Sequence, residues 1–176
     1  MRAILSNGRI LAIAIRSQRL GYAVLDCSNK LLDWGMVFYR WNGGKQVATT
    51  AKRISSLLEL YAPSAIVIEQ SELRQVRNVA GIRLLSRLLR REAVRQSVRF
   101  HATKQPDMRK AFRSFDAKSK DDVAAALAHM FPEVAYKLPQ RRRVWESEHS
   151  IMPMFDAIAV GVSYWEHAGV SIRAPE

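Results

Sequence analysis

The alternation of apolar and polar positions in the first forty residues predicts three consecutive strands. Residues 10–15 form an unbroken apolar run rich in isoleucine, which is typical of a strand buried on both faces. Residues 20–26 and 32–40 follow as two further apolar segments, each after a short polar turn. Short turns between successive strands favour antiparallel pairing, so we expect a three-stranded meander.

The remainder of the chain alternates between helical and strand patterns. The expected elements are a helix over 45–61, a strand over 64–69, a helix over 72–96, a strand over 98–102, helices over 106–113 and 119–131, a loop over 133–147 and a last helix over 151–167. Ser119 is the expected N-cap of the helix that follows it. This order describes an RNase H-like α/β fold, in which helices cover both faces of a mixed five-stranded sheet. We expect a single domain over 1–176.

The net charge of the chain indicates a class of binding partner. Lysine and arginine number 28 against 16 aspartates and glutamates, which gives a formal net charge of +12. A positive field of this size attracts polyanions, of which nucleic acid is the commonest. Cys27 is the only cysteine, so neither an internal disulfide nor a cysteine-based metal site is expected. The apolar run at 10–15 is too short for a signal-peptide core or a membrane span, and we expect a cytoplasmic protein.

Four segments together resemble one nuclease family, the RuvC-type Holliday junction resolvases. They are 10–22 (ILAIAIRSQRLGY), 65–69 (AIVIE), 105–131 and 155–160 (FDAIAV). In the first segment Ser17, Gly21 and Tyr22 match the family's first strand and turn in register. The resemblance follows the family's order over nearly the whole chain, and it implies a structure-specific endonuclease that acts on four-way DNA junctions as a homodimer.

The resemblance also implies a metal site. Enzymes of this family are expected to use two Mg²⁺ or Mn²⁺ ions, which take oxygen ligands and therefore need converging carboxylates. Glu69, after four apolar residues of a strand, and Asp156, in the last helix, match the family's catalytic and metal-binding acids. The resemblance also implies a lysine near the reacting phosphate, for which Lys118 and Lys120 are the two alternatives.

Four positions depart from the family pattern. The first-strand aspartate falls on Ala14, the proline and glycine after it fall on Ile15 and Arg16, and a second acid or histidine of the last helix falls on Pro153. For the ligand missing at Pro153 we single out Glu148, with Glu146 and His149 as alternatives. Ala14 has two explanations, a natural loss of the acid or an introduced substitution.

Two functions therefore remain open. One is a metal-dependent endonuclease for branched DNA that is impaired by Ala14, and the other is a RuvC-like protein that binds junctions without cutting them. A nuclease for ribonucleotide hybrids is a further candidate, because fold does not fix substrate.

Arginines mark the expected DNA-binding surface. The candidates are Arg16, Arg74, Arg77, Arg83, Arg87, Arg90, Arg141, Arg142 and Arg143. Contacts with the phosphate backbone need positive charge and no base readout. Beside the helical arginines, Leu84, Leu85, Leu88 and Leu89 form an apolar stripe that belongs either to the core or to a dimer interface. The aromatic residues Tyr39, Trp41 and Trp145 are candidates for stacking on unpaired bases, with fold support as the alternative.

Overall fold

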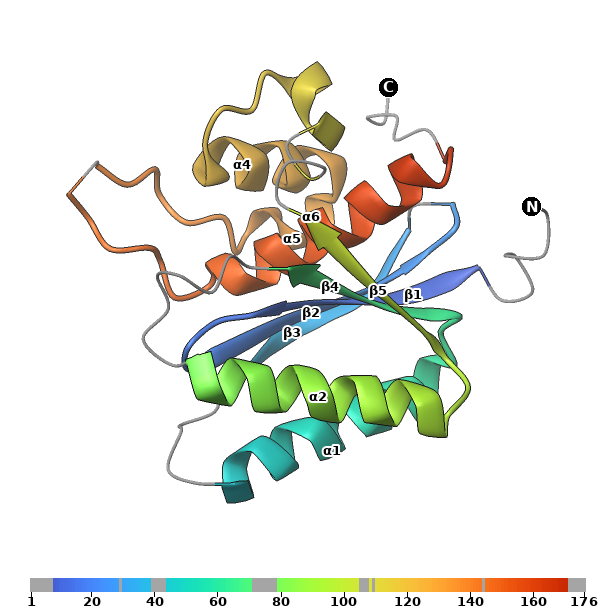
Figure 1. Ribbon diagram of the computed structural model, residues 1–176. Helices are drawn as coiled ribbons and strands as arrows, with labels where there is room; N and C mark the ends of the chain where they lie inside the picture. The colour runs from blue at the N-terminus through green and yellow to red at the C-terminus, as the bar shows by residue number, and fades with distance from the viewer. Residues whose placement is uncertain are drawn as a thin grey trace.

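Five strands form one mixed sheet at the centre of the protein (Figure 1). The computed structural model describes residues 8–28, 30–38, 44–70, 79–104, 108, 110–143 and 145–170. The strands are β1 (Arg9–Ile15), β2 (Arg19–Asp26), β3 (Leu31–Phe38), β4 (Ala65–Gln70) and β5 (Arg99–Lys104), in the spatial order β3-β2-β1-β4-β5. The first three strands pair antiparallel, whereas β4 and β5 run parallel to β1. The expected meander and mixed five-stranded sheet are confirmed.

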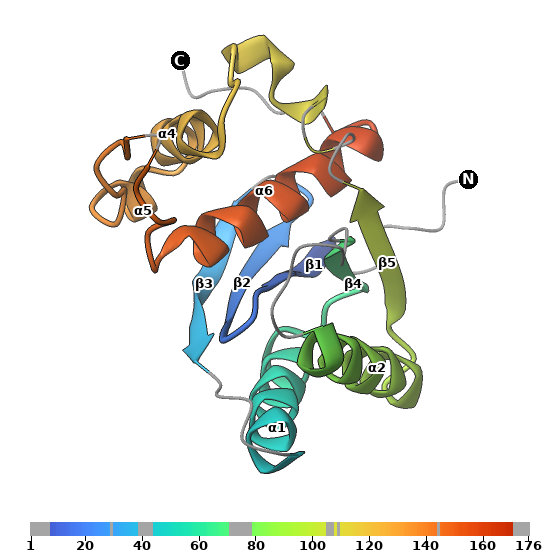
Figure 2. The same cartoon turned by 60° about the vertical axis from the view of Figure 1, so that its left-hand side comes forward.

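Helices cover both faces of this sheet (Figure 2). They are α1 (Gly44–Tyr61), α2 (Val79–Arg95), the 3₁₀ helix η2 (Arg113–Phe115), α4 (Lys120–Met130), α5 (Pro132–Ala135) and α6 (Met152–His167). On one face α1 and α2 pack against the sheet, and on the other face α6 lies across it with α4 outside α6. None of the described helices is long and apolar enough to cross a membrane.

Strand β1 explains why two apolar layers form. Its side chains alternate, so that Ile10, Ala12 and Ala14 pack under α6 while its other apolar residues pack against α1 and α2. A strand that buries both faces must be apolar at every position, which is the pattern of 10–15. Each fully buried isoleucine contributes about 2 kcal/mol of transfer free energy to the fold.

Most expected element boundaries agree with the structure. Ser119 caps α4 as expected: its side chain accepts a hydrogen bond from the backbone N–H of Asp122, whose carboxylate accepts one from the Ser119 N–H. The expected loop over 133–147 is wrong at its start, because α5 occupies Pro132–Ala135, where proline at the first helical position presets the backbone angle. Residues 72–78 of the expected arginine-rich helix over 72–96, and residues 106, 107 and 109 of the expected helix over 106–113, lie outside the described residues.

Glycine lets α6 approach the sheet closely. A Cβ at Gly21 on β2 would lie 1.8 Å from the Pro153 carbonyl oxygen, so any other residue there would push the start of α6 away. Gly161 plays the same part further along α6, where a Cβ would lie 2.4 Å from a methyl group of Leu25. This close packing sets Asp156, one turn after Pro153, over the end of β1.

Candidate functional site

The sheet brings the two family-matched acids to one place. Along β4, Ala65 and Val67 face α6, and Glu69 continues that alternation onto the same face. The parallel pairing of β1 with β4 runs to Ile13 opposite Ile68, and the next residues on the two strands are Ala14 and Glu69. Asp156 lies above them on α6. The position of the missing aspartate and both remaining acids therefore converge, as the resemblance implies.

Arg16 lies between these acids. Its Nη1 donates a hydrogen bond to Glu69 Oε2 at 2.6 Å, and its Nη2 donates one to Asp156 Oδ2. The side chains of Glu69 and Asp156 are 3% and 9% exposed and that of Arg16 is 21% exposed. A single guanidinium thus bridges two buried carboxylates from different elements. Arg16 was expected to contact DNA, and the structure places it inside the acidic cluster.

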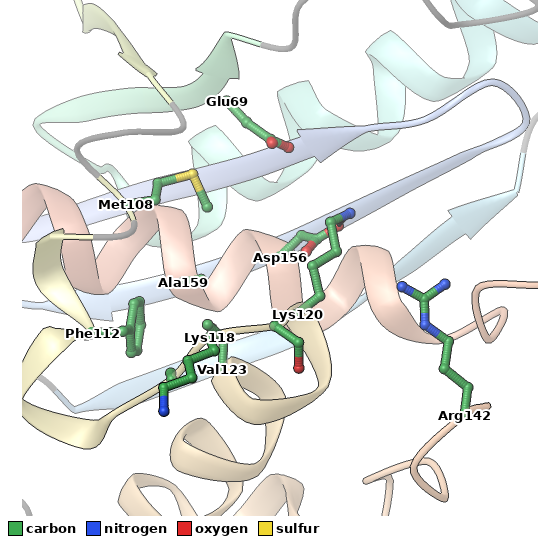
Figure 3. Close-up of a pocket in the computed structure, with 11 residues that line it drawn as sticks. Glu69, Met108, Phe112, Lys118, Lys120, Val123, Arg142, Asp156 and Ala159 are labelled. Atoms are coloured by element: carbon green, nitrogen blue, oxygen red, sulfur yellow. Dashed lines mark hydrogen bonds and ion pairs between the residues drawn. The ribbon is translucent and has the colours of Figure 1, made fainter. Parts of the chain in front are cut away.

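Lys120 supplies a second cation to the same cluster. Its ammonium group donates to Glu148 Oε1 at 2.8 Å and to Asp156 Oδ2 at 3.3 Å. Lys120 is the first residue of α4, so the Ser119 cap fixes the backbone from which this side chain extends. Lys118 precedes the cap, and its ammonium group lies 3.4 Å from Asp116 on the exposed surface. Of the two candidate lysines, Lys120 is the one that reaches the acids (Figure 3).

The three residues considered as a replacement ligand before α6 have different surroundings. Glu148 joins the cluster through Lys120, with its side chain 33% exposed. Glu146 instead accepts a hydrogen bond from the backbone N–H of Arg143 at 2.8 Å, and His149 Nδ1 accepts one from Ile151 at 3.4 Å. The structure therefore favours Glu148 among the three, and its role as a metal ligand stays a prediction.

Burial and charge act on the protonation of the cluster in opposite directions. Burial raises the pKa of Asp156 above its ordinary value, even though the positive charges of Arg16 and Lys120 lower it. For Glu148, burial also acts to raise the pKa, but the hydrogen bond and charge of Lys120 together with Arg16 outweigh it and lower that pKa. Burial alone would lower the pKa of Arg16, and the charges of Asp156 and Glu69 raise it instead, so Arg16 stays protonated.

A pocket of about 270 Å³ opens beside the cluster (Figure 3). Its apolar wall comes from Met108, Phe112, Val123 and Ala159, and its charged wall includes Lys120, Arg142, Glu69 and Asp156. The pocket therefore joins an apolar wall to a wall that carries both cations and acids. This is a suitable environment for a phosphate or a base of a nucleic acid next to the acids.

The donor set does not fit two divalent metal ions as the side chains are placed. Ala14 offers no side-chain oxygen, and one carboxylate oxygen each of Glu69 and Asp156 accepts a hydrogen bond from the Arg16 guanidinium. Within the described part of the chain, no group of three or more histidine, cysteine, aspartate and glutamate side chains could hold a metal ion. A requirement for Mg²⁺ or Mn²⁺ is not confirmed.

The basic loop before α6 lies against α4. Arg141 and Arg142 form ion pairs with Asp122 and Asp121 at 3.2 and 3.4 Å, and the Arg143 guanidinium lies 5.7 Å from the centre of the Trp145 ring. Trp145 is 78% exposed, so it is not part of the core. Together these residues form an exposed surface with both cationic and aromatic groups, and their contact with DNA stays a prediction.

The helical arginines lie on the other side of the sheet. Arg83, Arg87 and Arg90 are exposed on α2, while Arg74 and Arg77 lie outside the described residues, as do Tyr39 and Trp41. In the apolar stripe of α2, Leu85 and Leu89 are fully buried. Leu84 and Leu88 are half-buried against the same core. The stripe is therefore mainly core.

Sequence reasoning missed the pairing of Arg16 with the acids. The signal was present: an acid is absent at position 14, and a cation stands two residues later, directly after the strand. The backbone N–H of Arg16 donates to the Arg19 carbonyl at 2.8 Å, which holds this turn beside the acids.

Comparisons with known proteins agree on the fold. No family model matches the chain, and no curated protein matches it. Among solved structures, Thermus thermophilus RuvC in complex with a Holliday junction substrate matches with a TM-score of 0.69 and 15% identity, over 96% of this chain and 99% of that one. The yeast mitochondrial Holliday junction resolvase matches with a TM-score of 0.59 and 13% identity, over 93% and 83% of the two chains. The fowlpox virus resolvase with Holliday junction DNA matches with a TM-score of 0.56 and 12% identity, over 90% and 99%.

Proposed function

From its RuvC-type RNase H-like fold, we propose that this protein binds branched DNA, in particular four-way junctions, without cleaving it. One observation carries the proposal. At the end of β1 and β4, Glu69 and Asp156 are retained, but Ala14 replaces the third acid and Arg16 bridges the other two.

The surroundings of the cluster support DNA binding. Lys120 and Arg142 line the pocket next to the acids, and Arg142 also lines a neighbouring hollow together with Arg141 and Arg143. Together with the formal charge of +12, these cations are suited to the phosphate backbone. Two of the three similar structures contain Holliday junction DNA, which favours a branched substrate over plain duplex.

The state of the acids distinguishes the two candidate functions. An impaired endonuclease would regain cleavage when its first-strand acid alone is restored. A protein without catalysis would also differ in the groups around that acid. Arg16 and its ion pairs are such a difference, because they place a fixed positive charge on both acids and use one oxygen of each that a metal ion could otherwise take. The pairing therefore favours junction binding without cleavage.

Junction binding and cleavage can be measured side by side. We expect a labelled four-way junction to bind with a Kd at least about tenfold below that of a duplex of the same length, and to remain uncut in Mg²⁺ or Mn²⁺. The Ala14→Asp variant should also leave it uncut, while Ala14→Asp with Arg16→Gly is the variant expected to recover cleavage. Adding Glu69→Gln to that variant should abolish the cleavage again.

Each alternative result has a definite meaning. Paired nicks from Ala14→Asp alone would show an endonuclease that lacks a single ligand. They would contradict the proposal that the protein binds junctions without cleaving them. Equal affinity for junction and duplex would remove the proposed function and leave the fold. Tighter binding or faster cleavage of an RNA–DNA hybrid than of the junction would favour a nuclease that acts on such hybrids.

We also infer that the protein acts as a homodimer, because a four-way junction offers two equivalent strands to two symmetric sites. Sedimentation of the free protein and of its junction complex would measure this. One chain per junction at saturation would contradict it. A cytoplasmic location likewise stays a prediction.

A further inference from the structure

The charges around Asp156 form a compact alternating set. Arg16 contacts Glu69 and Asp156, and Lys120 contacts Asp156 and Glu148. Each cation is shared between two carboxylates, and Asp156 is shared between both cations. Only one net negative formal charge remains in the set, although it contains three acids.

The guanidinium lies where any shared cation would have to lie. A cation held by Glu69 and Asp156 together must sit between their oxygens, and the two terminal nitrogens of Arg16 occupy that space with one hydrogen bond to each acid. A planar guanidinium suits such a bridge because its donors have a fixed separation and direction.

Burial makes this cation necessary in the absence of a metal ion. Glu69 and Asp156 are almost completely covered, and an unpaired carboxylate in such surroundings is strongly disfavoured. Arg16 cannot be displaced easily, because its backbone closes the turn to Arg19 and its Nη1 also donates to the Ile15 carbonyl at 3.1 Å. The cation is thus part of the polypeptide and is always present.

We propose that Arg16, assisted by Lys120, takes the place of divalent cations in this protein: it neutralises Glu69 and Asp156 and keeps Mg²⁺ and Mn²⁺ from binding there. The proposal depends on the proposed function only for what it says of DNA, namely that junction binding needs no metal. It goes further in assigning the loss of metal to Arg16 as well as to Ala14. A metal ion entering this site would meet a fixed positive charge, and one oxygen of each acid that already accepts hydrogen bonds from a cation.

Metal binding to the free protein tests this directly. Mn²⁺ binding is measured by electron paramagnetic resonance and by calorimetry on protein treated with EDTA and dialysed, without DNA. The wild-type protein should bind no Mn²⁺ at these acids up to millimolar concentration. Arg16→Ala should gain at least about tenfold in Mn²⁺ affinity, because one repelling charge within a few ångströms is removed. The gain should disappear in Arg16→Ala with Glu69→Gln, which assigns it to this site.

Arg19→Ala is the matched control. Arg19 lies in the same turn, but its guanidinium lies over the Phe38 ring, 5.9 Å from its centre. It removes the same charge from the chain and should leave Mn²⁺ binding unchanged. A thermal unfolding series gives a second readout: Mn²⁺ should raise the Tm of Arg16→Ala and leave that of the wild type and of Arg19→Ala unchanged.

Two results would overturn the proposal. One is Mn²⁺ binding by the wild type that is lost in Glu69→Gln, which would show that the acids hold a metal beside Arg16. The other is an Arg16→Ala variant with no gain in affinity, which would show that Arg16 is not what excludes the metal. If Arg16→Ala does not fold, Arg16→Gln, which retains hydrogen-bond donors without the charge, replaces it under the same criteria.

The DNA experiment separates this proposal from the proposed function. Junction affinity of the wild type should be the same in EDTA and in Mg²⁺ at matched ionic strength. Loss of junction binding in EDTA, with binding retained in Mg²⁺, would contradict the metal substitution and leave the proposed function standing. Failure to bind junctions under both conditions would contradict the proposed function and leave the Mn²⁺ result to decide the role of Arg16.

Discussion

Two groups of ion pairs between arginine and an acid lie on the same side of the sheet. They differ in their exposure to water. In the first, Arg16 bridges Glu69 and Asp156, whose side chains are 3% and 9% exposed. In the second, Arg141 pairs with Asp122, and these side chains are 77% and 25% exposed. The chemical groups are alike, and the surroundings differ.

This difference determines what each pair can do. Charges that are removed from water interact strongly and cannot be left alone, so breaking the Arg16 pairs exposes the full cost of buried carboxylates. Exposed pairs contribute little to stability, because water and salt compete with them. Arg141 can therefore exchange an aspartate for a DNA phosphate at small cost, whereas Arg16 is committed to its acids.

The largest expected effect is on folding stability after removal of the buried cation. Arg16→Ala should lower the free energy of unfolding by about 3 kcal/mol, because two covered carboxylates lose their shared partner. Urea unfolding in EDTA measures this value. Adding Glu69→Gln and Asp156→Asn to Arg16→Ala should recover most of the loss, since no unpaired charge then remains. A loss below about 1 kcal/mol would mean that the Arg16 ion pairs contribute no more to stability than exposed ion pairs do.

The contrast between these regions also shows how far the sequence predicts the site. The apolar run at 10–15 predicts β1 because a strand between two helical layers is apolar at every position. The N-cap at Ser119 was predicted for a similar local reason. Glu69 and Asp156 were predicted to converge because they match the family's acids at a strand end and on the last helix, and the structure confirms that they are close to each other.

The destination of Arg16 could not be predicted in the same way. Its partners lie 53 and 140 residues away in the chain, so the pairing depends on how three elements meet. An arginine in an exposed-looking turn of a basic protein favours a DNA contact when it is considered alone. Lys118 and Lys120 could not be separated for the same reason, since only the position of the α4 cap decides which one points at the acids. Pro132 was compatible with a loop or a short helix, and packing of Val134 into the core accompanies α5.

A smaller effect is expected in the pH dependence of folding stability, which should have opposite signs for Asp156 and Glu148. Burial raises the folded pKa of Asp156, so its contribution to stability is fully present below its ordinary pKa of 3.8 and is lost as the pH rises through the folded value. The folded pKa of Glu148 is lowered, so its contribution is present above 4.5 and is lost as the pH falls through the folded value.

Urea unfolding between pH 3 and 7 on the wild type, Asp156→Asn and Glu148→Gln measures both trends. Relative to Asp156→Asn, the wild type should lose stability as the pH rises. Relative to Glu148→Gln, it should gain stability over the same direction of change. The same slope for both variants would mean that burial does not dominate at Asp156.

The smallest effect on stability is expected at the exposed pairs. Arg142→Ala and Arg141→Ala should leave the urea midpoint almost unchanged, because both arginines are exposed and water and salt already compete with their ion pairs. They should nevertheless weaken junction binding, and each should reduce the slope of log K against log salt concentration by about 1 if it contacts a phosphate. Fluorescence anisotropy across a salt series measures this slope. Arg9→Ala, at the opposite end of β1, is the matched charge control and should leave the slope unchanged. An equal reduction by Arg9→Ala would mean that the loop arginines contribute to DNA binding only through the net charge. The difference between buried and exposed arginine pairs would then concern folding stability alone.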